Sequence, residues 1–278
     1  MIDLAPNNPY SLELATPVLA AAGSLGYGVE VARQLGLGPR GAAHGLGALV
    51  TRTTTARARR GRPALVETPA GLLYLGAEQN PGMRAVRERF APVWAGWELP
   101  VLVSVAAESP AELAELLADL DMVEGVAGVE LPLAAHGVLA PAAAGPLIRA
   151  ARDATPLPLV VKLPGHAPDL AELARAAVAA GADALALVDG LPAAAPAAHG
   201  LAHGLLGGPA LRPLALRAVA EVVASVEAPV IGIGGVTGPA DARAMLDAGA
   251  TAVGLGSVLL ADLRAAARVA AGLTAHKA

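Results

Sequence analysis

Residues 228–257 read APVIGIGGVTGPADARAMLDAGATAVGLGS, and this stretch decides the fold. Its first part, 228–235, is an apolar run that ends in glycines, and its last part, 252–257, repeats that pattern. The residues between them, 238–250, have a helical pattern that closes with Ala-Gly-Ala, a common helix C-cap. Continuous apolar runs are typical of parallel strands buried on both faces. The stretch therefore predicts a strand, a helix and a second parallel strand.

The same alternation extends over the whole chain. Helical patterns at 109–121, 169–181 and 213–226 separate further apolar runs. These runs are 16–23, 47–53, 99–106, 128–133, 157–163 and 184–190. Eight strands with intervening helices predict an α/β chain folded as one (β/α)₈ TIM barrel over residues 1–278. The alternative is a doubly wound open sheet.

Two connections are longer than a simple link between elements requires. One is 53–82, after the second strand, and the other is 190–208, after the sixth. The second is rich in Pro, Ala and Gly, so we expect a long loop on the catalytic face of the barrel rather than a domain boundary. Long connections in compact domains are usually functional.

Composition excludes several classes of protein. The chain has 278 residues, of which 55 % are hydrophobic and 16 % charged, so it has ample material for a core and is not disordered. The net charge of −4 gives no reason to expect a nucleic-acid partner. No uncharged apolar stretch is long enough for a membrane span, and no basic segment precedes the first apolar run, so we expect a cytoplasmic protein. The absence of cysteine excludes disulfides, thiolate zinc sites and iron–sulfur ligation by this chain.

Glycines end the last two predicted strands. They are Gly234 and Gly235 after one strand and Gly256, followed by Ser257, after the other. In TIM barrels the loops after strands seven and eight form the usual phosphate site, because glycine lets backbone N–H groups approach an anion. The alternative is that these glycines serve only tight turns.

Lys162 is one of two lysines among 20 basic residues, and it ends the apolar strand 157–163. A buried ammonium is costly without a partner. Lys162 is therefore either a functional cation in the barrel mouth, able to stabilise negative charge on a reduced cofactor, or half of a structural ion pair.

Two further positions at strand ends carry side chains suited to chemistry. Arg52, with Thr53 beside it, is placed to bind an anionic cofactor or substrate, or is a solvated loop residue. His136 follows the fourth strand and is the histidine best placed for acid–base chemistry, the alternative being an exposed loop residue. The histidines form no helical metal-ligand pattern, so we expect no metal site.

Taken together, the motifs resemble the dihydroorotate dehydrogenases, FMN-containing TIM barrels of pyrimidine synthesis, and in particular their soluble class 1. The resemblance covers nearly the whole chain. The motifs that carry it are TPVLAAAGSLGYG (16–28), GALVTRTTT (47–55), ETPAGLLYLGAEQNPG (67–82), PLVVKL (158–163), GGPALRPLALRAV (207–219), PVIGIGGV (229–236) and AVGLGS (252–257).

The resemblance implies an FMN site and names its residues. It places the phosphate on the two glycine turns, the flavin edge along the first strand end, and Lys162 against the ring. The residues implied are Ala21, Ala22, Gly23, Arg52, Thr53, Lys162, Gly208, Gly234, Gly235, Gly256 and Ser257. It also implies substrate positions at Tyr74, Asn80 and Asp189.

The substrate half departs from the family pattern. The loop Asn-x-Ser-Cys-Pro-Asn is matched by 132–137, PLAAHG, which puts Ala135 where the family has its base. Amides that hold orotate in the family are replaced at four positions. The replacements are Tyr74, Pro132, Gly137 and Asp189. At Asp189 the change puts a carboxylate beside an anionic substrate, which is repulsive when it is ionised.

Three function classes remain open at this point. The first is an FMN-dependent oxidoreductase resembling dihydroorotate dehydrogenase, converting dihydroorotate to orotate with an altered base and clamp; His136 alone lies near the base position. The second is a flavin oxidoreductase with a changed substrate, and the third a non-catalytic barrel acting as a partner subunit. Besides a small-molecule substrate, the resemblance implies an iron–sulfur flavoprotein subunit as partner, and we expect a homo-oligomer.

Overall fold

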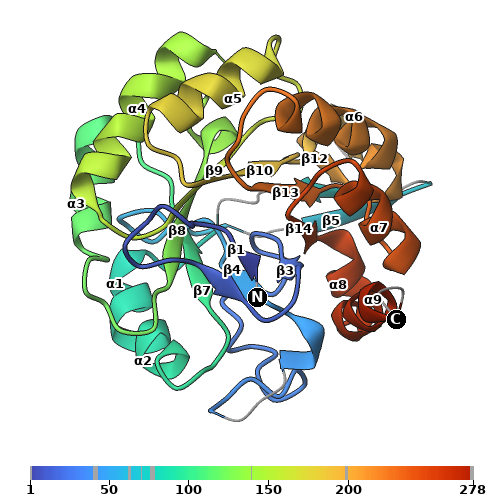
Figure 1. Ribbon diagram of the computed structural model, residues 1–278, viewed down its shortest axis with the longest axis horizontal. Helices are drawn as coiled ribbons and strands as arrows, with labels where there is room; N and C mark the ends of the chain where they lie inside the picture. Colours follow the sequence, from blue (N-terminus) through green and yellow to red (C-terminus); the bar gives the residue numbers. More distant parts are fainter. Residues whose placement is uncertain are drawn as a thin grey trace.

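Eight parallel strands close into a barrel in this computed structural model, which describes residues 2–39, 43–61, 64–69, 71–75, 79–138, 140–197 and 200–275. The strands follow one another around the barrel in chain order, and the last pairs with the first (Figure 1). They are β3 (Val18–Ala20), β4 (Ala48–Val50), β7 (Val101–Ser104), β8 (Gly128–Pro132), β9 (Leu159–Lys162), β10 (Ala184–Leu187), β13 (Val230–Ile233) and β14 (Ala252–Leu255). The predicted (β/α)₈ barrel is confirmed, and the open sheet is wrong because the β14–β3 pairing leaves no edge.

Helices surround the barrel, and the four predicted ones form within a few residues of their expected bounds. α3 begins after Ser109, whose Oγ accepts a hydrogen bond from the backbone N–H of Glu112 at 3.1 Å. Within the described ranges, no helix is long and apolar enough to cross a membrane. The helical elements are η1 (Ala43–Gly45), α1 (Met83–Ala85), η2 (Val86–Phe90), α2 (Ala91–Trp94), α3 (Pro110–Ala118), η3 (Leu133–His136), α4 (Pro141–Ala154), α5 (Leu170–Ala179), η4 (Pro209–Leu211), α6 (Arg212–Val223), α7 (Pro239–Asp247), α8 (Ser257–Ala261) and α9 (Ala265–Thr274).

The barrel interior has an apolar layer and a polar layer. Alternate residues of a strand point to opposite faces, so each strand sends every second side chain inward. The lower layer packs the strand side chains against the N-terminal segment, where β1 (Ile2–Asp3) and β2 (Glu13–Leu14) pair across the bottom. Towards the carboxyl ends the buried residues turn polar: Ser104, Glu130 and Lys162. In the described part of the chain, the two fully buried charged side chains, Glu130 and Lys162, therefore lie at the carboxyl end of the barrel.

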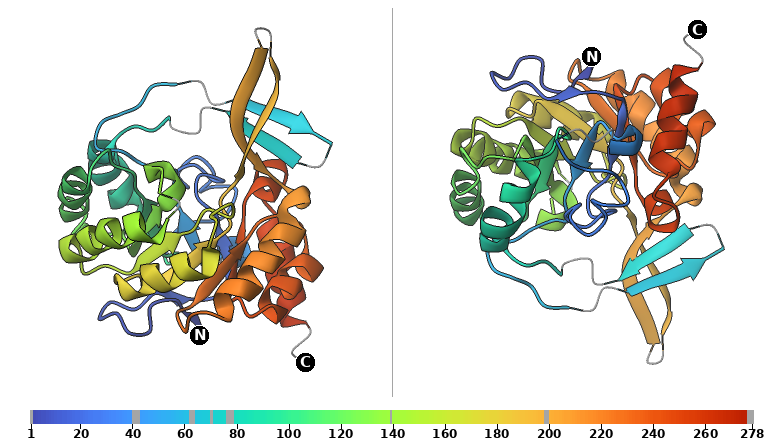
Figure 2. Two further views of the ribbon diagram at one scale, coloured as in Figure 1. Left: turned by 90° about the horizontal axis from the view of Figure 1, so that it is seen from above. Right: turned by 90° about the horizontal axis from the view of Figure 1, so that it is seen from below.

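Two β-hairpins from distant parts of the chain join into one antiparallel sheet above the barrel. β5 (Ala64–Thr68) and β6 (Gly71–Leu75) come from the connection after β4, and β11 (Leu191–Ala197) and β12 (Gly200–Gly207) from the one after β10. The strand order is β11-β12-β6-β5. Figure 2 shows the β11/β12 ribbon standing away from the helices.

The prediction of a long loop at 190–208 is therefore wrong, since most of it is a ribbon. β11 and β12 pair over seven positions, and β12 also pairs with β6. Its Ala, Gly and Pro residues have low strand propensity, so pairing between segments decides the structure. Gly71 shows how close the pairing is, because a Cβ there would lie 2.1 Å from the carbonyl oxygen of Gly207.

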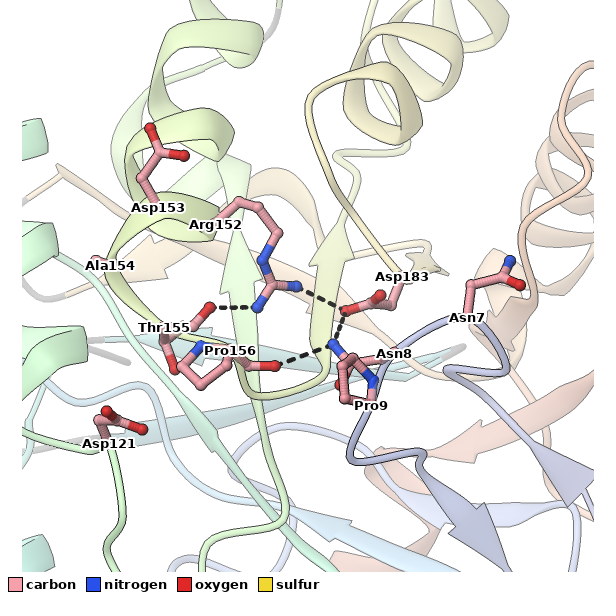
Figure 3. A pocket seen from close by; sticks show the side chains of 10 residues that line it. All are labelled: Asn7, Asn8, Pro9, Asp121, Arg152, Asp153, Ala154, Thr155, Pro156 and Asp183. Atoms are coloured by element: carbon pink, nitrogen blue, oxygen red, sulfur yellow. Dashed lines mark hydrogen bonds and ion pairs between the residues drawn. The ribbon is translucent and has the colours of Figure 1, made fainter.

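A cleft of about 540 Å³ lies at the opposite, amino-terminal end of the barrel. Arg152 of α4 holds this end together (Figure 3). Its guanidinium pairs with Asp183 at 2.9 Å and donates to the carbonyl oxygens of Thr155 and Leu157. Asp183 in turn accepts from the N–H of Leu159 at 2.8 Å. One side chain therefore fixes the end of α4 to the starts of β9 and β10.

We expect Arg152→Ala to lower the free energy of unfolding by about 2–4 kcal/mol, because it removes the ion pair with the partly buried carboxylate of Asp183 and leaves the carbonyl oxygens of Thr155 and Leu157 without this donor. Urea denaturation of the purified variant measures the change. Arg217→Ala is the matched control: its pair with Glu221 is an exposed i,i+4 contact worth about 0.5 kcal/mol. Equal losses in the two variants would contradict this role for Arg152.

Candidate active site

The two predicted phosphate turns lie side by side at the carboxyl ends of β13 and β14. These strands are neighbours, with Ile231 opposite Ala252. Gly234 has φ +126° and Gly235 φ +71°, a region that favours glycine. Among the described residues, no acceptor takes a hydrogen bond from the backbone N–H groups of either turn. Those N–H groups are at Gly234, Gly235, Gly256 and Ser257.

The turn after β14 leaves open space beside its backbone. Nothing lies within 4 Å of the position that a Cβ on Gly256 would take. At Gly235 the missing Cβ lets the backbone of Arg212 approach, since a Cβ there would lie 2.8 Å from the nitrogen of Arg212. Gly208, with φ +117°, leads from β12 into η4 and α6. Free donors around open space are the arrangement that binds an anion, so the residues present are compatible with a cofactor phosphate.

A chain of polar side chains crosses five neighbouring strands at the barrel mouth. Thr53 Oγ1 lies 3.0 Å from Ser104 Oγ, and Ser104 lies opposite Glu130 in the β7–β8 pair, where its hydroxyl opposes the rise of the Glu130 pKa. Lys162 Nζ donates to Glu130 Oε1 at 3.3 Å and lies 3.7 Å from Asp189 Oδ1. The side chains of Lys162 and Glu130 are 7 % and 1 % exposed, so the pair is enclosed by the barrel. The network links the ends of β4, β7, β8, β9 and β10.

The charges in this network depend on one another. Burial disfavours the ammonium of Lys162, but Asp189 and Glu130 outweigh it and raise the Lys162 pKa. Burial also raises the pKa of Glu130, against the opposing effect of Lys162. Lys162 is therefore a charged group held by two carboxyl groups. The ion pair named as the structural alternative for Lys162 exists, and Lys162 is also the residue that the resemblance implies to lie against the flavin ring.

The first two strand ends also meet at the mouth. β3 is followed by Ala21, Ala22 and Gly23, and a Cβ on Gly23 would lie 3.7 Å from the Cα of Arg52. The half-buried Arg52 donates through Nη1 to the carbonyl oxygen of Gln79 at 3.4 Å. This contact directs Arg52 to the connection that carries β5 and β6. The implied flavin-edge residues are thus brought together with Arg52 in one wall of the mouth.

Two of the implied substrate residues have other contacts. Burial raises the pKa of Tyr74, on β6, against the opposing effect of the nearby Ser257 hydroxyl. Asn80 is buried, and its Oδ1 accepts hydrogen bonds from the N–H of Thr55 at 3.2 Å and of Gly82 at 3.0 Å. Tyr74 therefore lies against the phosphate turn, and Asn80 holds the chain before α1 to the segment after β4. Asp189 points towards Lys162 in the mouth.

His136 lies in η3 with both ring nitrogens engaged by the backbone. Nδ1 is 3.1 Å from the carbonyl oxygen of Pro132, and Nε2 accepts from the N–H of Ala107 at 3.1 Å. This pattern requires the neutral ring with its proton on Nδ1. Burial lowers the His136 pKa, although the bond to Pro132 opposes the change. In this arrangement neither nitrogen is available to a substrate.

Sequence reasoning missed Glu130 and Ser104. The signal for Glu130 was present, because it is the one charged residue of the apolar run 128–133. A carboxylate in a strand that is buried on both faces requires a cationic partner. Lys162, in the next strand, is the buried cation that meets this requirement. Ser104 carries no such signal, since serine is common in strands and loops.

Comparison with known proteins agrees with this geometry. The sequence profile of the family described as dihydroorotate dehydrogenase matches residues 6–276. A protein of Desulforudis audaxviator named dihydroorotate dehydrogenase B (NAD(+)), catalytic subunit, is 40 % identical, over 94 % of this chain and 89 % of its own length. The protein of the same name from Pelobacter propionicus is 36 % identical, over 96 % of this chain and 91 % of its own.

We expect His136→Asn to flatten the pH dependence of stability. Because the folded pKa of His136 is lowered, the unfolded chain takes up the proton first as pH falls below about 6.5. His136 therefore stabilises the fold above that pH, and the contribution is lost as pH falls through its folded pKa. The slope reaches at most about 1.4 kcal/mol per pH unit for one proton.

Urea denaturation at pH 7.5 and 5.5 measures this difference. The wild type, measured at the same two pH values, is the reference. If His136→Asn keeps the wild-type slope, His136 is not held neutral by the fold.

Proposed function

Because the chain belongs to the dihydroorotate dehydrogenase family, we propose that it is an FMN-dependent oxidoreductase of that type, acting in pyrimidine biosynthesis. The observation that carries the cofactor assignment is the pair of glycine turns with unpaired N–H groups, next to a buried cation in the same barrel mouth. The reaction of the family takes two hydrogens from dihydroorotate. A hydride leaves C6, a proton leaves C5, and the C5=C6 double bond of orotate forms.

In this proposal different residues bind different parts of the cofactor. Bound FMN supplies the site that accepts the hydride. The N–H groups of Gly234, Gly235, Gly256 and Ser257 would hold its phosphate, with the Tyr74 side chain near Ser257. Ala21, Ala22 and Gly23 line the flavin edge, and the Lys162 ammonium stabilises negative charge at the ring. Glu130 keeps Lys162 in the mouth, which makes it a positioning residue.

The residues at the family's proton-accepting position are poorly suited to that role in this chain. Ala135, at the position of the family's base, has no group that accepts a proton, and both nitrogens of His136 are engaged. The set of amides that holds orotate in the family is also altered, since Pro132 and Gly137 have no amide side chain. We therefore propose a dehydrogenase in which the hydride from C6 would pass to the flavin and the C5 proton to solvent water, without a positioned base in the loop after β8. Such a base contributes about 10²–10⁴-fold to the rate.

We further propose a partner subunit for electron transfer. The two relatives named above are catalytic subunits of NAD(+) enzymes, which supports a division of labour between chains. This chain has no cysteine, so iron–sulfur ligands must come from the partner. An iron–sulfur flavoprotein would carry the electrons from the barrel to NAD(+). The proposal therefore separates substrate oxidation, in this chain, from acceptor reduction in the other.

We expect Gly256→Ala to weaken FMN binding by about tenfold or more, because its methyl group fills the open space at the phosphate turn. Fluorescence quenching during titration of apo-protein with FMN gives the dissociation constant, which for the wild type should be about micromolar or tighter. Gly238→Ala is the matched control, since its Cβ also meets open space but lies beyond the turn. No flavin binding by the wild type would overturn the proposed function.

We expect dihydroorotate to reduce the bound flavin about 10²-fold or more below the usual enzyme rate, on the order of 10 per second. Ala135→Cys restores a proton acceptor and should raise that rate at least about tenfold. Ala134→Cys places the same thiol one residue away and should not. Stopped-flow absorbance measures all three proteins. Rapid reduction of the wild type would show that the base lies elsewhere.

A further inference from the structure

We propose that the Tyr74 hydroxyl binds the phosphate of the cofactor, so that Tyr74 belongs to the cofactor side of the mouth and not to the substrate side. The inference rests on the proposed function and adds a side-chain donor to the two glycine turns. Tyr74 lies on β6, which pairs with β5 on one side and with β12 on the other. Its position is therefore fixed by strand register on both sides.

The Tyr74 side chain lies along one face of the sheet above the barrel. Its directly paired neighbours, Leu65 on β5 and Leu205 on β12, share that face. The ring extends to Gly207, where a Cβ would lie 2.8 Å from Cε2 of Tyr74. A side chain at residue 207 would have to displace the ring, so the glycine allows this close approach. The ring therefore lies over the end of β12, next to the start of η4.

This position connects Tyr74 to both glycine turns. On the turn after β14, the hydroxyl of Ser257 is near enough to Tyr74 to act on its phenol. On the turn after β13, a Cβ at Gly235 would lie 2.8 Å from the backbone nitrogen of Arg212, five residues beyond Gly207. Tyr74 is thus a direct neighbour of one turn, and the short stretch 207–212 links it to the other.

The Tyr74 phenol is suited to donate a hydrogen bond to an anion. Burial raises its pKa, so it keeps its proton at neutral pH. Within the described ranges, no carboxylate or backbone carbonyl oxygen accepts a hydrogen bond from it. The oxygens of a phosphate are strong acceptors, and hydrogen bonds to a charged group are stronger than those between neutral groups. A phosphate on the glycine turns would therefore give this donor a partner.

FMN and riboflavin test the inference, since riboflavin lacks only the phosphate. Each is titrated into the apo-protein, and quenching of the flavin fluorescence gives its dissociation constant. Tyr74→Phe removes the hydroxyl and keeps the ring over Gly207. We expect this variant to bind FMN about tenfold more weakly than the wild type, as for the loss of one hydrogen bond to a charged group. Its affinity for riboflavin should change by less than about twofold.

Tyr27→Phe is the matched control. It deletes the same hydroxyl group, which lies 3.0 Å from Thr54 Oγ1 after β4, two strands away from β14. This variant should bind FMN as tightly as the wild type, and melting temperatures show whether both variants are folded. An equal loss of affinity for FMN and riboflavin in Tyr74→Phe would mean that the hydroxyl supports the fold or the flavin ring and not the phosphate. That result, or an unchanged affinity for FMN, overturns the inference.

The outcome also separates this inference from the proposed function. A wild type that binds neither flavin fails the proposed function at the cofactor step. A wild type that binds FMN, together with a Tyr74→Phe variant that binds it equally well, retains the cofactor site and overturns only the role of Tyr74. Orotate titrated into the FMN-loaded proteins then shows the other role: weaker orotate binding in that variant would place Tyr74 on the substrate side, as the resemblance implies.

Discussion

The ion pair between Lys162 and Glu130 is the interaction on which the site depends. Successive side chains of a strand point to opposite faces, and Glu130 and Lys162 both occupy inward-facing positions of their strands. Neither tolerates that position alone, since an unpaired buried charge is costly. The lower interior is apolar and filled by the N-terminal segment, so the polar layer lies only at the carboxyl ends. The barrel thereby confines its chemistry to one face.

Most of the fold, and the glycine turns of the candidate site, could be predicted from the sequence. The barrel strands were predictable because parallel strands buried on both faces leave a continuous apolar run. The hairpin strands β11 and β12 were not, because glycine, alanine and proline carry little strand preference and their pairing partner β6 lies over a hundred residues away. The glycine turns were predictable from glycine at two adjacent strand ends. The contact of Tyr74 with Ser257 was not, since it depends on how the hairpins pair.

The two halves of the mouth have diverged to different degrees. In the proposed site the cofactor side would depend on backbone N–H groups and on glycines, which a drift towards Ala and Arg leaves intact. The substrate side would depend on side chains, and the positions where the resemblance implies amides hold Tyr74, Pro132, Gly137 and Asp189. A binding site built from backbone is thus more robust to changes in composition than one built from side chains.

The sheet above the barrel has two edges of different character. β11 carries Pro192 and Pro196, which lack the N–H that a neighbouring strand requires, whereas β5 has no proline. A sheet can extend by strand pairing through many molecules only if both of its edges can pair with a neighbouring strand. With one edge blocked, edge-to-edge pairing through β5 joins at most two copies and then stops. The prolines of β11 thus protect this exposed ribbon against fibrous aggregation.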